Sequence, residues 1–172
     1  SRIDGKGKAE RVTPQALTGQ HSYQVSGDAR WAIHTAQSAA MPPRIALVQL
    51  QGHKEVKLLQ DNAALKARVE QLKLNPKEFV KVDIGEVVLD AWMIKPVNFD
   101  PAKKYPLIFY VYGEPASSTV QDAWQGGDLW HHFLAQQGYV VMSIDNRGTN
   151  VPRGRDWRKC IYRQVGILAA KD

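Results

Sequence analysis

Two apolar stretches, YPLIFYVYGEP at residues 105–115 and YVVMSIDNRG at residues 139–148, decide how this chain folds. Each begins as a short run rich in β-branched and aromatic residues, which is typical of a strand covered on both faces. A helix-like stretch around residues 129–134 lies between them. Strand, helix and strand in this order predict a βαβ unit with two parallel strands.

The two runs end in polar, glycine-containing segments, Tyr112–Pro115 and Asp145–Gly148. In open α/β sheets, binding and catalytic groups gather beyond the carboxyl ends of the strands. Parallel pairing would bring these two segments to the same edge of the sheet. We therefore expect the functional residues of this chain among them.

The 172 residues carry 23 Lys and Arg against 17 Asp and Glu, a formal net charge of +6. The basic residues are scattered among acidic ones, a pattern that favours a solvated surface over a nucleic-acid site. The single cysteine, Cys160, excludes an internal disulfide and a multi-cysteine zinc site. No apolar run approaches the length that spans a bilayer. We expect no nucleic-acid partner and no membrane span.

The first 60 residues alternate short β-rich runs with turn signals. Residues 4–7, DGKG, predict a turn. The Pro42-Pro43 pair is expected to break the chain, since proline cannot donate to a sheet ladder. Strands are expected at residues 21–26, 30–35, 44–50 and 55–59. Four strands at this spacing fit a sandwich or one blade of a propeller.

Residues 61–74 change to a helical period. The apolar side chains on one predicted face are Leu65, Val69 and Leu72. Asp61 or Asn62 would cap the start, and Asn75-Pro76 would end the helix. This helix is expected to connect two domains and to lie on a domain surface.

An antiparallel hairpin is expected next, with strands at residues 78–83 and 87–94 turned by Gly85. Beyond Gly148 the sequence is polar. A helix is expected to begin near Trp157 or later and to be still running at residue 172, so that the chain looks cut at both ends.

Several motifs together resemble the prolyl oligopeptidase family, most closely its dipeptidyl peptidase IV branch. VYGEP at residues 111–115 is similar to the family's Val-Tyr-x-Gly-Pro, and DNRGT at 145–149 to its Asp-x-Arg-Gly-Ser/Thr. LDAWMIKP at 89–96 looks like the family's antiparallel entry strand. SGDARW at 26–31 looks like a hairpin of the family's β-propeller. The motifs span nearly the whole chain, in the family's order.

The resemblance implies a mixed fold in three parts. Residues 1–60 would be the C-terminal strands of a β-propeller, and residues 61–76 a connecting helix. Residues 77–172 would be the first, incomplete part of an α/β-hydrolase peptidase domain.

The family acts through a Ser-Asp-His triad with a Gly-x-Ser-x-Gly nucleophile elbow. None of the serines of this chain lies in such a motif. The resemblance places the triad downstream of residue 172, so this chain alone is expected to hydrolyse nothing. The parent protein would be a serine peptidase that releases N-terminal Xaa-Pro or Xaa-Ala dipeptides from peptides.

By the family match, Tyr112 is the catalytic residue within this chain. Its hydroxyl would donate to the oxyanion of the tetrahedral intermediate, beside a backbone N–H of the elbow. From position alone, a packing role at the strand end is favoured. Glu114 stands where the family usually has glycine, which predicts backbone strain if that residue has a positive φ. A solvated Glu114 is favoured over one that binds a substrate amine.

Asp145 and Arg147 are expected to be structural, with Arg147 binding loop carbonyls or a carboxylate and Asp145 capping the turn. His131 and His132 are neighbours on a helix and would point to different sides, so they form no metal pair.

The other histidines, His21, His34 and His53, lack carboxylate or cysteine partners at ligand spacing. No metal site and no cofactor are expected. Trp130 and Phe133 are expected to pack against the sheet.

Two other functions stay open at this point. One is an inactive fragment or binding module of the same fold, and the other an acylaminoacyl peptidase or esterase relative. The expected partner is a peptide substrate, and a homodimer of the intact protein stays open. The resemblance implies a periplasmic or secreted protein whose signal lies outside this chain.

Overall fold

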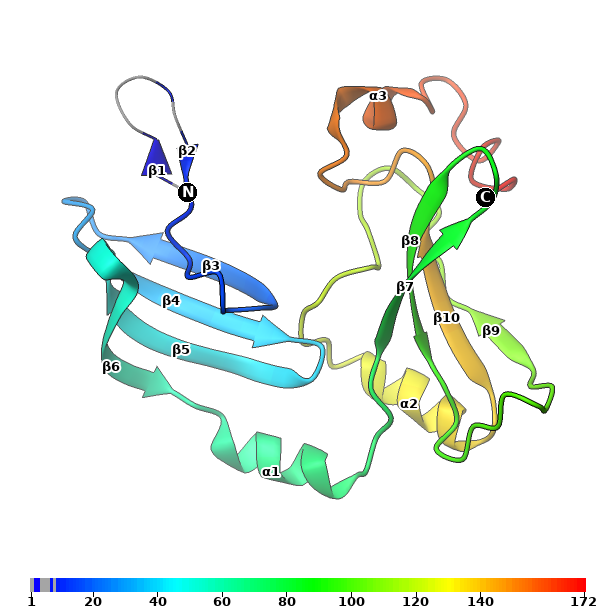
Figure 1. Cartoon of the computed structure of the whole chain (residues 1–172), viewed down its shortest axis with the longest axis horizontal. Helices are drawn as coiled ribbons and strands as arrows, with labels where there is room; N and C mark the ends of the chain where they lie inside the picture. The colour runs from blue at the N-terminus through cyan, green and yellow to red at the C-terminus, as the bar shows by residue number, and fades with distance from the viewer. Residues whose placement is uncertain (1, 4–6, 8) are drawn as a thin grey trace. The chain divides into compact units, whose positions relative to one another are not determined.

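The computed structural model describes residues 2–3, 7 and 9–172, and it divides into two compact units. The first unit runs to Lys73 and includes Asp122–Gln125, and the second comprises Leu74–Gln121 and Gly126–Asp172. Figure 1 shows the order of their helices and strands. The turn predicted at residues 4–7 lies, except for Gly7, outside the described residues.

The first unit is built on a four-stranded antiparallel sheet in sequence order. Its strands are β3 (Gln20–Val25), β4 (Trp31–Ser38), β5 (Met41–Gln49) and β6 (Lys54–Gln60), and a short 3₁₀ turn, η1 (Gln51–His53), precedes β6. Two further short strands, β1 (Arg2–Ile3) and β2 (Ala9–Glu10), pair antiparallel with each other. The four strands predicted between residues 21 and 59 are therefore confirmed.

Pro42 and Pro43 lie inside β5, so the prediction that they break the chain is wrong. Neither proline has a partner in the ladders, because β4 pairs with Met41 and then with Arg44, and β6 pairs only from Ile45 onward. The register shifts here, because Pro42 and Pro43 of β5 stand opposite the single residue Gln37 of β4, as in a β-bulge. The prolines are tolerated because the ladder asks for no N–H donor where they stand.

Helix α1 (Ala63–Gln71) confirms the helical period predicted at residues 61–74. Asn62 is the N-cap residue but makes no side-chain cap hydrogen bond, whereas the Asp61 carboxylate before it accepts from the Ala63 N–H at 3.0 Å. The predicted end before Asn75-Pro76 is also confirmed. No residue of α1 is buried, so the helix lies on the surface of its unit.

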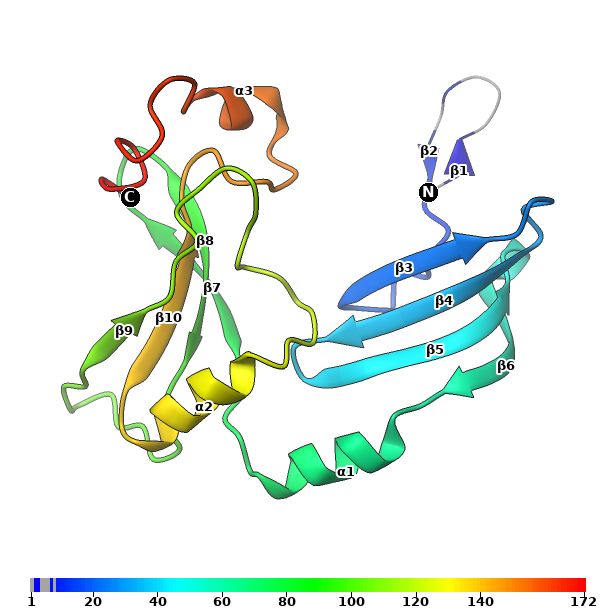
Figure 2. The same ribbon diagram turned by 180° about the vertical axis from the view of Figure 1, so that it is seen from behind.

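The second unit contains a mixed sheet in the order β7-β8-β10-β9. Its strands are β7 (Glu78–Asp83), β8 (Val88–Ile94), β9 (Leu107–Phe109) and β10 (Val140–Asp145). Figure 2 shows β9 at one edge of this sheet. Strands β7, β8 and β10 pair antiparallel, whereas β9 and β10 pair parallel. The predicted hairpin and the predicted parallel pair are both confirmed.

The core of the second unit lies between β8, β10 and helix α2 (Asp128–Gln136). Trp92, Ile94, Ala135 and Val141 are almost fully buried there. Because Trp92 lies opposite Ser143 and Ile94 opposite Val141 in the antiparallel register, their side chains share one face. This is the face on which α2 packs.

Two predictions for the second unit are wrong: that the strand at the first apolar run is covered on both faces, and that the last helix begins near Trp157 or later and runs to residue 172. Strand β9 is only three residues long, and Leu107 and Phe109 are about half exposed, because β9 lies at the edge of the sheet. Helix α3 (Gly154–Lys159) begins before Trp157 and does not continue to residue 172. Turns follow it, with Arg163 and Gly166 at positive φ, a conformation that ends a helix.

Candidate functional site

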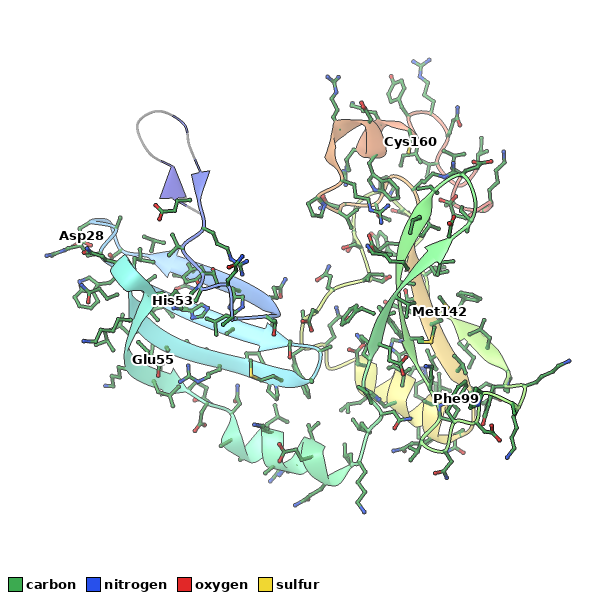
Figure 3. All side chains as sticks on the ribbon, in the orientation of Figure 1. Asp28, His53, Glu55, Phe99, Met142 and Cys160 are labelled. Atoms are coloured by element: carbon green, nitrogen blue, oxygen red, sulfur yellow. The ribbon has the colours of Figure 1, made fainter. Side chains whose placement is uncertain are left out.

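The parallel pairing of β9 and β10 brings the two polar strand ends to one edge, as the sequence predicts. Leu107, Ile108 and Phe109 lie opposite Val140, Val141 and Met142. One further hydrogen bond, from the Tyr110 N–H to the Met142 carbonyl at 2.8 Å, continues the pairing beyond β9. Met142 is labelled on β10 in Figure 3.

Tyr112 follows β9 outside regular structure, and its side chain is 46% exposed. Among the described residues, no hydrogen bond involves its hydroxyl, and its ring makes no close stacking contact. The neighbouring Val111 is also exposed. The packing role favoured from position alone is therefore not what the structure shows, and the Tyr112 hydroxyl is available as a donor.

Glu114 does not carry the backbone strain that its place in the motif predicts. The positive φ of this segment is at Gly113, at 78°, and Glu114 is absent from the residues with positive φ. Glycine therefore stands where the left-handed conformation is needed. The Glu114 side chain is exposed, which agrees with a solvated carboxylate.

Asp145 does not cap its own turn, so that prediction is wrong. Its carboxylate is 2% exposed and reaches the segment that follows the Tyr112 loop. Oδ1 accepts from the Thr119 N–H at 2.7 Å and from the Thr119 hydroxyl at 3.1 Å, and Oδ2 accepts from the Val120 N–H at 3.2 Å. The following turn is instead closed by the Thr149 hydroxyl, which donates to the Asn146 carbonyl.

Thr119 is a site residue that belongs to none of the motifs recognised in the sequence. Besides its bonds to Asp145, its hydroxyl shares a hydrogen bond with the Ser143 hydroxyl at 2.6 Å. Its carbonyl accepts from the Trp92 indole N–H at 3.0 Å. Ser143 and Asp145 are two residues apart in β10, so the sequence predicts that their side chains lie on the same face of the sheet. Their partner lies 24 or more residues away in an irregular segment.

Arg147 binds carboxylates, as predicted. Its backbone N–H and Nε donate to the Asp172 carboxylate at 2.7 and 2.8 Å, and Nη1 donates to Glu86 at 3.0 Å. These hydrogen bonds, the one to Asp172 first, raise the pKa of Arg147 above its ordinary value. Arg147 therefore holds residues 86 and 172 to the end of β10.

Gly148 has a φ of 86°, and a Cβ there would lie 2.5 Å from the Ile161 side chain. Ile161 is buried. The glycine of the DNRGT motif is thus required twice, by the left-handed backbone and by the close approach of the isoleucine.

The start of α2 is held by a buried ion pair. Lys77 Nζ lies 2.5 Å from Asp128 Oδ2, with side-chain exposures of 2% and 9%. Burial alone would raise the pKa of Asp128, but the hydrogen bonds from His131 and Lys77 outweigh it and lower that pKa. The His131 ring lies against Trp92 and Tyr110, with centroids 5.2 and 4.9 Å apart.

His132 has a buried Nδ1 without a partner among the described residues. Burial lowers its pKa. Trp130 and Phe133 are exposed and stack on each other with centroids 5.5 Å apart, so the prediction that they pack against the sheet is wrong.

The first unit contains a cluster of aromatic and polar side chains that the sequence did not reveal. His21 Nδ1 and His34 Nε2 are 2.9 Å apart, and the Tyr23 hydroxyl bonds to His53 Nε2 and to Thr13 Oγ1, both at 2.8 Å. The His34 ring stacks on Tyr23 at 4.5 Å. His53 is labelled beside this sheet in Figure 3. We call His21, Tyr23, His34 and His53 the histidine cluster.

Burial lowers the pKa of His34 from 6.5 to about 4, with further contributions from His53 and His21. The His34 ring is therefore disfavoured as a cation inside the histidine cluster. Within the described part of the chain, no group of three or more His, Cys, Asp or Glu side chains is arranged to hold a metal ion. Across the same residues, no helix is long and apolar enough to cross a membrane.

The chain is similar to known peptidases. It is 30% identical over 173 residues to the Probable dipeptidyl-aminopeptidase B of Emericella nidulans, covering 99% of this chain and 19% of that protein. It is 33% identical over 120 residues to the prolyl endopeptidase FAP of Homo sapiens, covering 69% of this chain and 15% of that protein. No family model matches.

The solved structure of dipeptidyl peptidase 4 from Porphyromonas gingivalis superimposes with a TM-score of 0.88 at 38% identity, over 96% of this chain and 23% of that one. These relatives define a class of peptidases. The chain belongs to the prolyl oligopeptidase family, in its dipeptidyl peptidase IV branch. It spans about a fifth of the length of these relatives.

Proposed function

We propose that this chain is part of a serine peptidase that releases Xaa-Pro or Xaa-Ala dipeptides from the N-termini of peptides. The names of the relatives, dipeptidyl-aminopeptidase B and dipeptidyl peptidase 4, support the dipeptide product. The nucleophilic serine, with its aspartate and histidine, would lie in sequence outside these residues, since none of the serines here stands in a Gly-x-Ser-x-Gly motif.

The observation that carries this proposal is the free hydroxyl of Tyr112 beyond the parallel pair β9 and β10. It is exposed, and among the described residues no side chain or backbone group takes its hydrogen bond. A fixed donor directed at the developing oxyanion stabilises the tetrahedral transition state more than the substrate. We assign this role to Tyr112.

The proposal extends to the architecture. The sheet β3–β6 has the four antiparallel strands of a propeller blade, which supports residues 1–60 as the end of a β-propeller. Helix α1 would be the connection at residues 61–76. The parallel step from β9 through α2 to β10 supports residues 77–172 as the first part of an α/β-hydrolase domain.

The test uses the full-length protein that contains this chain and an Xaa-Pro chromogenic substrate. We expect the wild type to release the dipeptide, and Tyr112→Phe to lower kcat by about 10²–10³-fold with a much smaller change in KM. Tyr110→Phe is the matched control, because the Tyr110 side chain is equally exposed and its ring packs on His131.

A wild type that hydrolyses only N-acylated amino acids or simple esters would favour the acylaminoacyl peptidase or esterase alternative. A wild type that hydrolyses none of these substrates would leave a binding role for the fold. Full turnover in Tyr112→Phe would remove Tyr112 from the reaction without affecting the substrate class.

A further inference from the structure

The segment that carries Tyr112 is fixed to one strand at both of its ends. At its start, the Tyr110 N–H donates to the Met142 carbonyl at 2.8 Å. At its end, the Thr119 and Val120 N–H groups donate to the Asp145 carboxylate at 2.7 and 3.2 Å. Met142 and Asp145 both belong to β10. Residues 111–118 therefore form a loop whose closure is set by β10.

We propose that Asp145 is a positioning residue: by holding Thr119 and Val120 it sets the path of the 111–118 loop and so the placement of the Tyr112 hydroxyl. This inference rests on the proposed function. Asp145 does not itself contact the reacting atoms. It acts through the loop, so its effect on the reaction requires Tyr112.

At the second end of the loop, every polar group of Thr119 takes part in a hydrogen bond. Thr119 uses its N–H toward Asp145, its hydroxyl toward Ser143 and Asp145, and its carbonyl toward the Trp92 indole. Both Thr119 and Asp145 are buried. A buried polar group that loses its partner is costly because water does not replace it. The end of the loop is therefore held in a single arrangement.

The charge of Asp145 strengthens the attachment. Within the described part of the chain, its carboxylate takes part in no ion pair with a lysine or arginine, and the donors it accepts from belong to Thr119 and Val120. Hydrogen bonds to an ionised acceptor are shorter and stronger than those between neutral groups. Release of the loop would leave a buried carboxylate without these donors.

The stretch between the two ends has few other attachments. The described contacts from other elements to residues 111–116 include one hydrogen bond, from Arg158 Nη1 to the Pro115 carbonyl at 2.9 Å. Gly113, with its φ of 78°, adds freedom next to Tyr112. The position of the Tyr112 hydroxyl therefore depends on how firmly the ends are held, and Asp145 is the principal acceptor at the second end.

The test is a double-mutant cycle in the full-length protein between Asp145→Asn and Tyr112→Phe, with the Xaa-Pro substrate. The asparagine keeps the shape and directs an amide nitrogen at an N–H donor. We expect Asp145→Asn to lower kcat by about 10- to 100-fold, because small misplacements of a catalytic group are costly, while KM changes less than about threefold. The double variant should fall no more than about threefold below Tyr112→Phe alone.

Two further variants separate positioning from folding. Thr119→Val removes the hydroxyl bonds but keeps the N–H to Asp145, and it should lower kcat by about three- to tenfold. Asp83→Asn is the matched control: its exposed carboxylate also accepts a backbone N–H, that of Gly85 at 2.8 Å, in the β7–β8 hairpin. Its kcat should stay within about twofold of the wild type. Amide exchange in residues 111–118 should quicken in Asp145→Asn and not in Asp83→Asn.

Unchanged kcat in Asp145→Asn, or losses that multiply in the double variant, would overturn the positioning role while leaving the peptidase proposal intact. A wild type without dipeptidyl peptidase activity would overturn the proposed function and this inference together. Non-multiplying losses combined with unchanged amide exchange in residues 111–118 would also overturn the positioning role, because Asp145 would then act on the reaction without changing the loop.

Discussion

In the first unit, the polar side chains packed on the sheet hydrogen-bond to one another, whereas in the second unit they bind a loop. The histidine cluster joins β3, β4 and η1 through hydrogen bonds between its side chains. Asp145, Ser143 and Trp92 instead hold Thr119, which lies outside the sheet. Polar side chains on strands thus link neighbouring elements of the sheet in one unit and fix an irregular segment in the other.

The ion pairs of the two units differ in how far water reaches them. In the first unit, Arg44 binds Glu55 through two hydrogen bonds at 2.7 and 2.8 Å on the exposed surface. In the second unit, Lys77 binds Asp128 where both side chains are nearly inaccessible to water. A pair in water contributes little, whereas a buried charge that loses its partner is costly.

The largest expected effect is the loss of unfolding free energy when the cation of the buried ion pair is removed. Lys77→Met should destabilise the second unit by about 3–5 kcal/mol, because Asp128 would remain as a buried charge without its ammonium partner. Arg44→Met, the matched change in the first unit, should cost no more than about 1 kcal/mol. Urea unfolding of the full-length protein, read by amide exchange in each unit, measures both. Equal costs would remove the distinction between the two pairs.

A second prediction concerns pH. Because the folded pKa of His34 is about 4 and its unfolded value is 6.5, the unfolded chain binds the proton more readily between these limits. The stabilisation is complete above pH 6.5 and is lost as the pH falls toward 4. The loss should reach at most about 3.5 kcal/mol, since the shift from 6.5 to about 4 corresponds to roughly 1.4 kcal/mol per pKa unit.

The charged and titratable groups around His34 are His21, His53, Arg44 and Glu55. Amide exchange of β4 between pH 7 and pH 4 measures the predicted loss. In His34→Gln, whose amide can still bond to His21 but does not titrate, this part of the pH dependence should vanish. An unchanged pH dependence in that variant would assign it to other groups.

The smallest expected quantity is the difference between two glycine substitutions, which separates the two demands on Gly148. Gly148→Ala should cost about 2–4 kcal/mol, from the positive φ and from the overlap with Ile161. Gly85 has a similar φ of 85°, but a Cβ there would have no atom within contact distance. Gly85→Ala should therefore cost only about 1 kcal/mol. Thermal unfolding of both variants gives the difference, which isolates the packing contact. A difference near zero would mean that Ile161 moves aside.

Much of the fold follows from local pattern. The runs at 21–26, 30–35, 78–83 and 139–144 are strands because their residues favour a pleated surface and turn signals bound them. The parallel pair follows from the intervening helix. The shortness of β9 did not follow, since the apolar run continues through Tyr112 after the pairing with β10 has ended.

The site was less accessible to sequence reasoning. The strand ends could be placed, because parallel pairing fixes where the carboxyl ends lie, but the exposure of Tyr112 could not be predicted from its position. Thr119 and the histidine cluster could not, since their partners lie 10 to 30 residues away and no local signal joins them. The role of Asp145 was misassigned for the same reason: the carboxylate binds a distant segment rather than the neighbouring turn.

The two prolines at the start of β5 have a consequence for the folding of the first sheet. A slip of β5 along β4 by two residues would keep every side chain on its face, so the hydrophobic pattern alone does not forbid it. Such a slip in one direction would bring Pro42 and Pro43 into positions where β4 or β6 requires an N–H. Pro42 and Pro43 therefore disfavour a two-residue slip of β5 in that direction, which the pattern of apolar residues alone would accept.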